Sequence, residues 1–272
     1  MRKILLSSCA LLLVSACSTD PNRGGYYQDD GPHSQPHINV DAIANAIPRS
    51  EPLSKSGNDP YVVFGKEYTP MASTQGYKER GVASWYGKKF HGNNTSSGER
   101  YDMYAMTAAH KTLPLPSYVK VENLRNGKYV IVRVNDRGPF LHNRLIDLSY
   151  AAAKKLGIVA TGTGLVEVSA IAMHDSVLQV EALPESQHTG HKTNNPEIYL
   201  QVGAFSQKEN AANLRLKLID ADMDKIVIQD QQLENGQIYR VRIGPLKSVE
   251  ESDQLAERVR QNGIWDAHVI IE

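Results

Sequence analysis

The sequence predicts a mainly β domain followed by a small α+β domain. Short segments rich in β-branched and aromatic residues recur at close spacing between residues 59 and 175, which favours a small barrel over an open sandwich. Residues 197–272 instead repeat a strand, a helix and a strand, which predicts a βαββαβ unit with both helices on one face of a single sheet. Between them, residues 176–196 are rich in Pro, Ser, Gly, Asn and His and are predicted to be a linker.

Five candidate strands and one short helix account for the first domain. Asn126-Gly127 is a strong hairpin signal between two of the strands. The helix is predicted over 150–157, with Ser149 as its N-cap and Gly157 as its stop. The predicted strands are 61–64, 81–86, 118–124, 129–134 and 166–172.

Two similar strand-helix units make up the second domain. The strands 198–205 and 238–246 have similar sequences, and a further strand is predicted after each helix, at 225–229 and at 267–271. The Ser206/Glu209 and Ser248/Glu251 pairs both fit the capping box, in which a hydroxyl and a carboxylate satisfy unpaired backbone donors. Both helices are therefore predicted to begin in the same way.

Charge and composition exclude some function classes. The chain has 30 basic and 30 acidic side chains and 41% apolar residues, which is ordinary for a globular protein. A protein dedicated to duplex nucleic acid usually carries a basic face that neutralises phosphates. We therefore expect no nucleic-acid partner.

The first 16 residues have the pattern of a secretory signal. Arg2 and Lys3 precede an apolar run over 4–14 that is too short to span a bilayer, and small residues follow it. The segment VSAC at 14–17 resembles the bacterial lipobox, which implies cleavage before Cys17 and lipidation of that residue. The alternative is a plain secreted protein with an incidental cysteine. Cys9 lies within the signal, so lipidation would also remove the only thiol of the mature chain.

Residues 17–58 are predicted to form a flexible tether. They are mostly small or polar, so this stretch cannot bury enough apolar surface to offset its ordering entropy. A chain of this length has a root-mean-square reach of roughly 35 Å. Ser18 follows the cysteine, and by resemblance to other lipoproteins a residue other than Asp there implies sorting to the outer membrane.

Four separated motifs in the first domain carry a family resemblance. They are GVASWYG at 81–87, TSSGERYD at 95–102, TAAHKTLP at 107–114 and VRVNDRGP at 132–139. In this order they resemble the rare lipoprotein A (RlpA) family, whose core is a double-psi β-barrel. Expansins and some lytic transglycosylases and cellulases share this barrel, so the fold by itself does not define a function. The second domain resembles SPOR domains, which bind peptidoglycan glycan strands stripped of stem peptides at division sites.

The resemblance implies an endolytic lytic transglycosylase. In such enzymes the muramyl 6-hydroxyl attacks its own anomeric carbon and leaves a 1,6-anhydro end, and one carboxyl group can serve both proton transfers. Asp136 matches the acidic position that related barrels use as the general acid. Glu99 and His110 also match the family pattern, and would orient the sugar, tune Asp136 or exchange roles with it. The alternatives are a turn carboxylate for Asp136, a surface pair with Arg100 or Lys111 for Glu99, and an ordinary polar residue for His110.

Several further residues are candidates for contact with the glycan. Trp85 and Tyr86 either line a sugar groove or belong to the core. Arg137 follows the candidate acid and is assigned to substrate binding. If the strands of the second domain alternate, one face of the sheet is free for glycan; the candidates there are Gln201, Phe205, Arg240 and Arg242, and the alternative is a solvated face.

No cofactor or metal is expected. His91, His142 and His174 lack paired metal spacing, and neither a phosphate-binding glycine loop nor a hydrolase elbow occurs. Three function classes remain: a lipid-anchored transglycosylase acting on peptide-free glycan at the septum, a non-catalytic expansin-like wall-binding protein, and a structural lipoprotein of the division site. The first is preferred, because a pure binder has no need of three titratable groups. Its expected partners are glycan strands, the membrane and possible division-site proteins.

Overall fold

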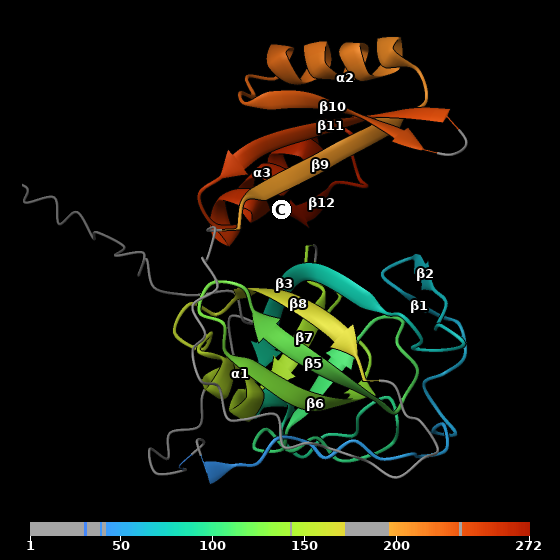
Figure 1. Ribbon diagram of the computed structural model, residues 1–272, viewed down its shortest axis with the longest axis vertical. Coiled ribbons are helices and arrows are strands. Elements are labelled where there is room, and N and C mark those ends of the chain that lie inside the picture. The colour runs from blue at the N-terminus through green and yellow to red at the C-terminus, as the bar shows by residue number, and fades with distance from the viewer. Residues whose placement is uncertain (1–29, 32–38, 40–41, 142, 172–195, 234–235) are drawn as a thin grey trace, which may run out of the picture.

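The computed structural model describes residues 30–31, 39, 42–141, 143–171, 196–233 and 236–272. They form a closed barrel and a separate sheet with two helices (Figure 1). The signal segment, Cys17, His142, His174 and all but the last residue of the predicted linker lie outside the described residues. No helix in the described ranges combines the length and apolar character that crossing a membrane requires.

Six strands close the barrel, in the order β3-β7-β4-β6-β5-β8. Two of the pairings, β3 with β7 and β4 with β6, are parallel, and the others are antiparallel. The prediction of a double-psi β-barrel is confirmed. Its strands are β3 (Lys78–Tyr86), β4 (Thr107–His110), β5 (Ser117–Asn123), β6 (Tyr129–Asp136), β7 (Ile146–Ser149) and β8 (Gly164–Ala170). A small hairpin of β1 (Tyr61–Val63) and β2 (Lys66–Tyr68) and a 3-10 turn, η2 (Lys88–Phe90), lie outside it.

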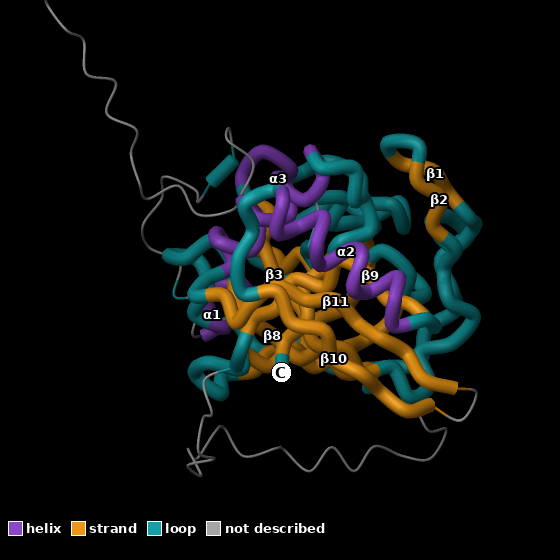
Figure 2. Tube along the Cα trace, turned by 90° about the horizontal axis from the view of Figure 1, so that it is seen from above, coloured by secondary structure: helices purple, strands orange, loops and turns teal. Residues whose placement is uncertain are grey.

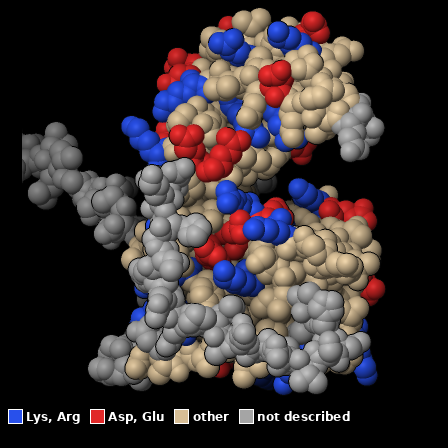
Figure 3. All heavy atoms as spheres, in the orientation of Figure 1, with Lys and Arg blue, Asp and Glu red and all other residues tan. Residues whose placement is uncertain are grey.

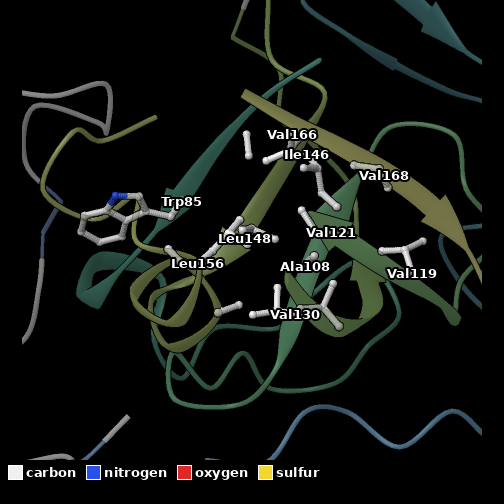
Figure 4. Close-up of a cluster of buried hydrophobic side chains, with 14 of the residues drawn as sticks. Trp85, Ala108, Val119, Val121, Val130, Ile146, Leu148, Leu156, Val166 and Val168 are labelled. Atoms are coloured by element: carbon white, nitrogen blue, oxygen red, sulfur yellow. The ribbon is translucent and has the colours of Figure 1, made fainter. Parts of the chain in front are cut away.

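Alternate residues of the strands fill the barrel. Val119, Val121, Val130 and Leu148 point into its interior (Figure 4), and all four are fully buried. Because side chains of a strand alternate between its two faces, the residues between these core positions lie on the outer surface of the barrel.

Helix α1 (Tyr150–Leu156) covers one part of the barrel as predicted. The Ser149 hydroxyl accepts a hydrogen bond from the Ala152 amide at 3.2 Å, and Gly157 ends the helix in the left-handed conformation, which costs glycine no steric strain. Leu156 joins the barrel core.

The second domain has the predicted βαββαβ order and forms a four-stranded antiparallel sheet, β10-β11-β9-β12. Leu218 of α2 and Val259 of α3 belong to one apolar cluster with Leu200 and Val241 of the sheet, so both helices pack on the same face. Helix α2 lies along β9 and β11 (Figure 2). The elements are β9 (Ile198–Phe205), α2 (Lys208–Asp220), β10 (Ile226–Leu233), β11 (Gly236–Leu246), α3 (Val249–Gln261) and β12 (His268–Ile271).

The two helices of this sheet begin differently, and one predicted cap is wrong. Ser248 caps α3 by accepting a hydrogen bond from the Glu251 amide, as expected. Helix α2 has Gln207 at its N-cap, and that residue makes no capping hydrogen bond. Because α2 begins at Lys208, Ser206 lies one residue before the cap and its hydroxyl cannot close a capping box with Glu209.

Part of the predicted tether lies against the barrel. The side chains of Ile43 and Ala46 pack on the barrel core, and the Asn45 amide oxygen accepts a hydrogen bond from the Ile131 backbone. Glu51 forms two hydrogen bonds to the guanidinium of Arg133, each 2.9 Å long. Residues 42–58 therefore differ from a fully flexible tether, because a few apolar and charged side chains give this polar stretch a place on the barrel.

The two domains contact each other. Arg144, just before β7, is buried and makes a bidentate ion pair with Asp253 of α3, with N–O distances of 3.0 and 2.6 Å. Val82 and Leu165 of the barrel join the apolar cluster of the second domain. On the face drawn in Figure 3, side chains of both charges gather where the two domains meet.

Candidate active site

Four polar or small residues lie side by side across the outer face of four adjacent strands. The register pairs Ser84 of β3 with Asp147 of β7, Asp147 with Ala109 of β4, and Ala109 with Asp136 of β6. The two carboxyl groups are thus two strands apart, with only a methyl group between them. At the usual strand spacing their α-carbons are roughly 10 Å apart.

Asp136 is held by three donors on a single oxygen. Its Oδ1 accepts hydrogen bonds from the Ser96 amide and the Ser96 hydroxyl, both at 2.7 Å, and from the Arg137 amide at 2.8 Å. Among the described residues nothing donates to Oδ2. Three hydrogen bonds fix the orientation of this carboxyl group, while its second oxygen remains available to a ligand.

Glu99 lies on a turn beside the end of β6 that carries Asp136. Its Oε2 accepts hydrogen bonds from Arg133 at 2.8 Å and from the Asn135 side chain at 2.9 Å. The surface pair with Arg100 or Lys111 that the sequence left open is not formed. The turn that carries Glu99 is joined to β6 through the Ser97 amide, so Glu99 and Asp136 belong to one site.

His110 does not point toward these carboxylates. It follows Ala109 on β4, so strand alternation turns its side chain to the other face, and only 3% of it is exposed. Its Nδ1 accepts hydrogen bonds from the amides of Thr112 and Leu113, which leaves the proton on Nε2 to be donated to the Tyr77 hydroxyl. Burial, assisted by two neighbouring cations, lowers the pKa of His110 to about 3. The imidazole therefore remains neutral and supports the loop that follows β4.

Asp147 is the titratable group that sequence reasoning missed. It is half-buried, and the Ser84 hydroxyl donates a short hydrogen bond to it. Burial raises its pKa from 3.8 to about 6; Ser84, Arg144 and Lys111 oppose the rise and Asp136 adds to it. One sequence signal was available: Asp147 stands between Ile146 and Leu148, two strand residues that a barrel must bury, so its own side chain had to lie on the outer face.

The aromatic candidates divide between the core and the outer face. Trp85 is 2% exposed and belongs to the barrel core, so it cannot stack on a sugar. Tyr86 lies on the outer face and stacks on Tyr101, with ring centroids 4.0 Å apart. The Tyr86 hydroxyl is buried and lies beside the hydroxyl of Thr107 on β4.

Arg137 has a structural role and does not face a substrate. Its guanidinium donates to the backbone carbonyls of Gly57, His110 and Leu113, at distances between 2.6 and 3.0 Å, and the residue is almost fully buried. These contacts occupy the donors that substrate binding would need. Arg137 instead joins three loops around the end of the barrel.

The four candidates in the second domain do not share one surface. Gln201 and Arg242 are paired across β9 and β11, and both are buried, with Arg242 in an ion pair with Glu272. Arg240 is half-buried on the same face. Phe205 is paired with Tyr239, and both pack against the cluster beneath the helices, so Phe205 lies on the opposite face.

A cavity of about 760 Å³ lies between the two domains and is distinct from the carboxylate row. Its walls include His110, Lys111 and Arg144 from the barrel and Trp265 and His268 from the second domain, but none of the three carboxyl groups described above. Within the described residues no group of three or more His, Cys, Asp or Glu side chains is arranged to hold a metal ion.

Two family models match the two domains of this chain. A family model described as "Lytic transglycolase" matches residues 78–169, and one described as "SPOR domain" matches residues 194–269. The fold and these matches define the class, a double-psi β-barrel of the lytic transglycolase type joined to a SPOR domain.

Relatives that match nearly the whole length of this chain define its family. The endolytic peptidoglycan transglycosylase RlpA of Pseudomonas aeruginosa strain UCBPP-PA14 is 39% identical over 94% of this chain and 90% of that protein. The protein of that name from Vibrio cholerae is 38% identical over 99% of this chain and 97% of its own length. A crystal structure of the RlpA SPOR domain from Pseudomonas aeruginosa is 27% identical, with a TM-score of 0.26, and matches 27% of this chain and 96% of that one. The chain belongs to the RlpA family.

Proposed function

We propose that this protein is an endolytic lytic transglycosylase that cleaves peptide-free glycan strands of peptidoglycan. The reaction breaks the bond from the muramyl anomeric carbon to the next sugar and joins that carbon to the 6-hydroxyl of the same sugar. One proton goes to the leaving oxygen and one leaves the 6-hydroxyl, so no water is consumed. Carboxyl groups positioned beside a sugar perform both transfers.

The observation that carries the proposal is that the carboxyl groups of Asp136 and Glu99 lie in one site at the end of β6. Asp136 offers a free carboxylate oxygen, held in place by three donors to the other oxygen. Glu99 is partly exposed and is held by Arg133 and Asn135, where it can accept a hydrogen bond from a sugar hydroxyl. In this arrangement Asp136 exchanges a proton with the substrate and Glu99 orients the sugar, while His110 maintains the shape of the loop beside them.

The second domain and the N-terminal segment suggest where the activity operates. We assign the SPOR domain to the binding of glycan strands at the septum, and Cys17 to a lipid anchor in the outer membrane. Arg240 is the candidate glycan contact there, since Gln201 and Arg242 are buried and Phe205 lies on the helix side. Division-site proteins remain candidate partners.

Mass analysis of products from peptide-free glycan tests the proposal. Wild-type protein should release fragments with 1,6-anhydromuramyl ends, and Asp136→Asn and Glu99→Gln should each reduce the rate at least 100-fold. Glu167→Gln is the matched control, because Glu167 is a barrel carboxylate that pairs with Lys78 and Arg80 on the surface. Reducing ends instead would indicate a hydrolase, and binding without products would support the expansin-like alternative.

Deletion of 197–272 tests the assignment of the SPOR domain. The remaining chain should cleave soluble glycan and lose its ring-like localisation at the septum. Unchanged localisation after the deletion would contradict the assignment.

A further inference from the structure

We infer that Asp147 is a second catalytic carboxyl group, which donates the proton to the leaving glycosidic oxygen while ionised Asp136 accepts the proton of the 6-hydroxyl. This inference rests on the proposed transglycosylase function and divides its two proton transfers between two residues. It is carried by the strand register, which places the two carboxyl groups on one outer face of the barrel, two strands apart.

Asp147 lies in a strand whose other side chains are buried. Its neighbours Ile146 and Leu148 are fully buried in the barrel, whereas Asp147 is turned outward beside Ala109. Packing alone does not explain a carboxyl group in a half-buried site where, among the described residues, Ser84 provides its one side-chain hydrogen bond. Burying a carboxyl group with so few partners costs stability, and such groups are concentrated at functional sites.

The two carboxyl groups have contrasting surroundings. Three donors hold one oxygen of Asp136, while burial favours the protonated form of Asp147 and raises its pKa to about 6. Two carboxyl groups with opposite environments divide naturally into an acid and a base. Ala109 between them adds only a methyl group and leaves both oriented toward the same surface.

Two buried hydroxyl groups lie on the same face. The Tyr86 hydroxyl, one strand from Asp147, lies beside the Thr107 hydroxyl of β4, and the described residues provide neither with a further hydrogen-bond partner. Both lie on the outer face of the barrel, because their neighbours along the strands, Trp85 and Ala108, belong to the core. Polar groups therefore flank the two carboxyl groups on this face of the barrel.

Asp147 gives its proton to the glycosidic oxygen as the bond to the anomeric carbon breaks and its electron pair goes to that oxygen. The 6-hydroxyl oxygen bonds to the anomeric carbon, and its proton passes to Asp136. Exchange with solvent then returns a proton to Asp147 and removes one from Asp136.

The dependence of activity on pH involves every ionisable or hydrogen-bonding group near Asp147. Activity requires protonated Asp147, so kcat/KM should be highest below about pH 6 and fall as the pH rises through that value. The groups that face it are Ser84 and Tyr86 from β3, Lys111 after β4, Asp136 from β6, Arg144 before β7 and Tyr101 from the preceding loop.

The test measures kcat/KM of the full mature protein in detergent on peptide-free glycan between pH 4.5 and 8.5. Asp147→Asn should lower kcat/KM at least 100-fold at the optimum and abolish the alkaline fall of any residual activity. Ser84→Ala removes a hydrogen bond that stabilises the carboxylate, so the midpoint of the alkaline fall should move to higher pH, which a merely structural role would not produce. Asp102→Asn, in an exposed carboxyl group of the same domain, should leave the profile unchanged.

The outcomes separate this inference from the proposed function. If wild-type protein yields no anhydro ends, both are overturned. If wild-type protein cleaves, Asp136→Asn does not, and folded Asp147→Asn retains activity within threefold, only the role of Asp147 is overturned. An alkaline midpoint that Ser84→Ala leaves unmoved also overturns it.

Discussion

Replacing Asp147 with Asn should make the barrel more stable at neutral pH while removing its activity. In the wild-type protein the folded barrel raises the pKa of this carboxyl from its ordinary 3.8 to about 6, mainly through burial. The folded state therefore binds the proton more tightly than the unfolded state does. Stability is fully present below about pH 4, falls as the pH rises from 4 to 6, and is constant above that range.

The size of the effect follows from the same values. A pKa that rises from 3.8 to about 6 corresponds to a loss of about 3 kcal/mol between acidic and neutral pH, at 1.36 kcal/mol for each pKa unit. The neutral amide of Asn is isosteric and its oxygen can still accept the Ser84 hydrogen bond. We expect a gain of about 1–3 kcal/mol at pH 7 and little difference at pH 4.

Urea unfolding at pH 4, 5, 6, 7 and 8 measures this difference. The chain has two tryptophans, Trp85 in the barrel and Trp265 in the SPOR domain. A Trp265→Phe background therefore lets fluorescence report the barrel alone. Asp102→Asn in that background is the control, because Asp102 is exposed. If Asp147→Asn changes the unfolding free energy equally at every pH, the raised pKa is refuted as the cause.

Three further predictions concern stability. Ser248→Ala should destabilise the SPOR domain by about 1 kcal/mol in thermal unfolding, whereas Ser206→Ala, which removes no cap, should have almost no effect. Glu51→Gln should destabilise the barrel by about 1–3 kcal/mol at pH 7 in urea unfolding. Hydrogen bonds, above all from Arg133, lower the Glu51 pKa to about 2, so its contribution is present above pH 4.5 and disappears as the pH falls toward 2. Arg144→Met should separate the unfolding of the two domains in calorimetry.

These predictions fail in distinct ways. Equal losses for the two serine variants would contradict the difference between the two helix starts. A Glu51→Gln effect that persists at pH 2 would mean that the carboxylate charge is irrelevant. A single cooperative transition in Arg144→Met, at the wild-type temperature, would show that this ion pair does not couple the domains.

Local sequence signals were sufficient for most of the fold. Runs of apolar residues predicted four of the six barrel strands, and Asn126-Gly127 predicted the turn between β5 and β6, but β4 and β7 were not predicted as strands. Ser149 and Gly157 correctly marked the two ends of α1. These features depend on residues close together in the chain, so the sequence contains the information directly. The cap predicted at Ser206 was wrong because α2 begins one residue later than predicted. Where this helix begins depends on where the preceding strand, β9, ends.

The site was less predictable, because it depends on how strands distant in sequence are paired. His110 is close to Asp136 in the family pattern, but alternation on β4 turns it away. Trp85 and Arg137 have chemistry suited to sugars, yet closure of the barrel buries one and occupies the donors of the other. Asp147 becomes visible only when β7 is placed between β3 and β4, since nothing in its local sequence connects it with Asp136.

Backbone hydrogen bonds between strands, rather than flexible loops, determine the separation of Asp136 and Asp147. Asp136 is on β6, which is hydrogen-bonded to β4 and β5, and Asp147 is on β7, which is hydrogen-bonded to β3 and β4. Their spacing therefore cannot change without opening the barrel. Replacing the surface loops with those of a relative should therefore change which glycan binds. The distance between the Asp136 and Asp147 carboxyl groups should stay the same.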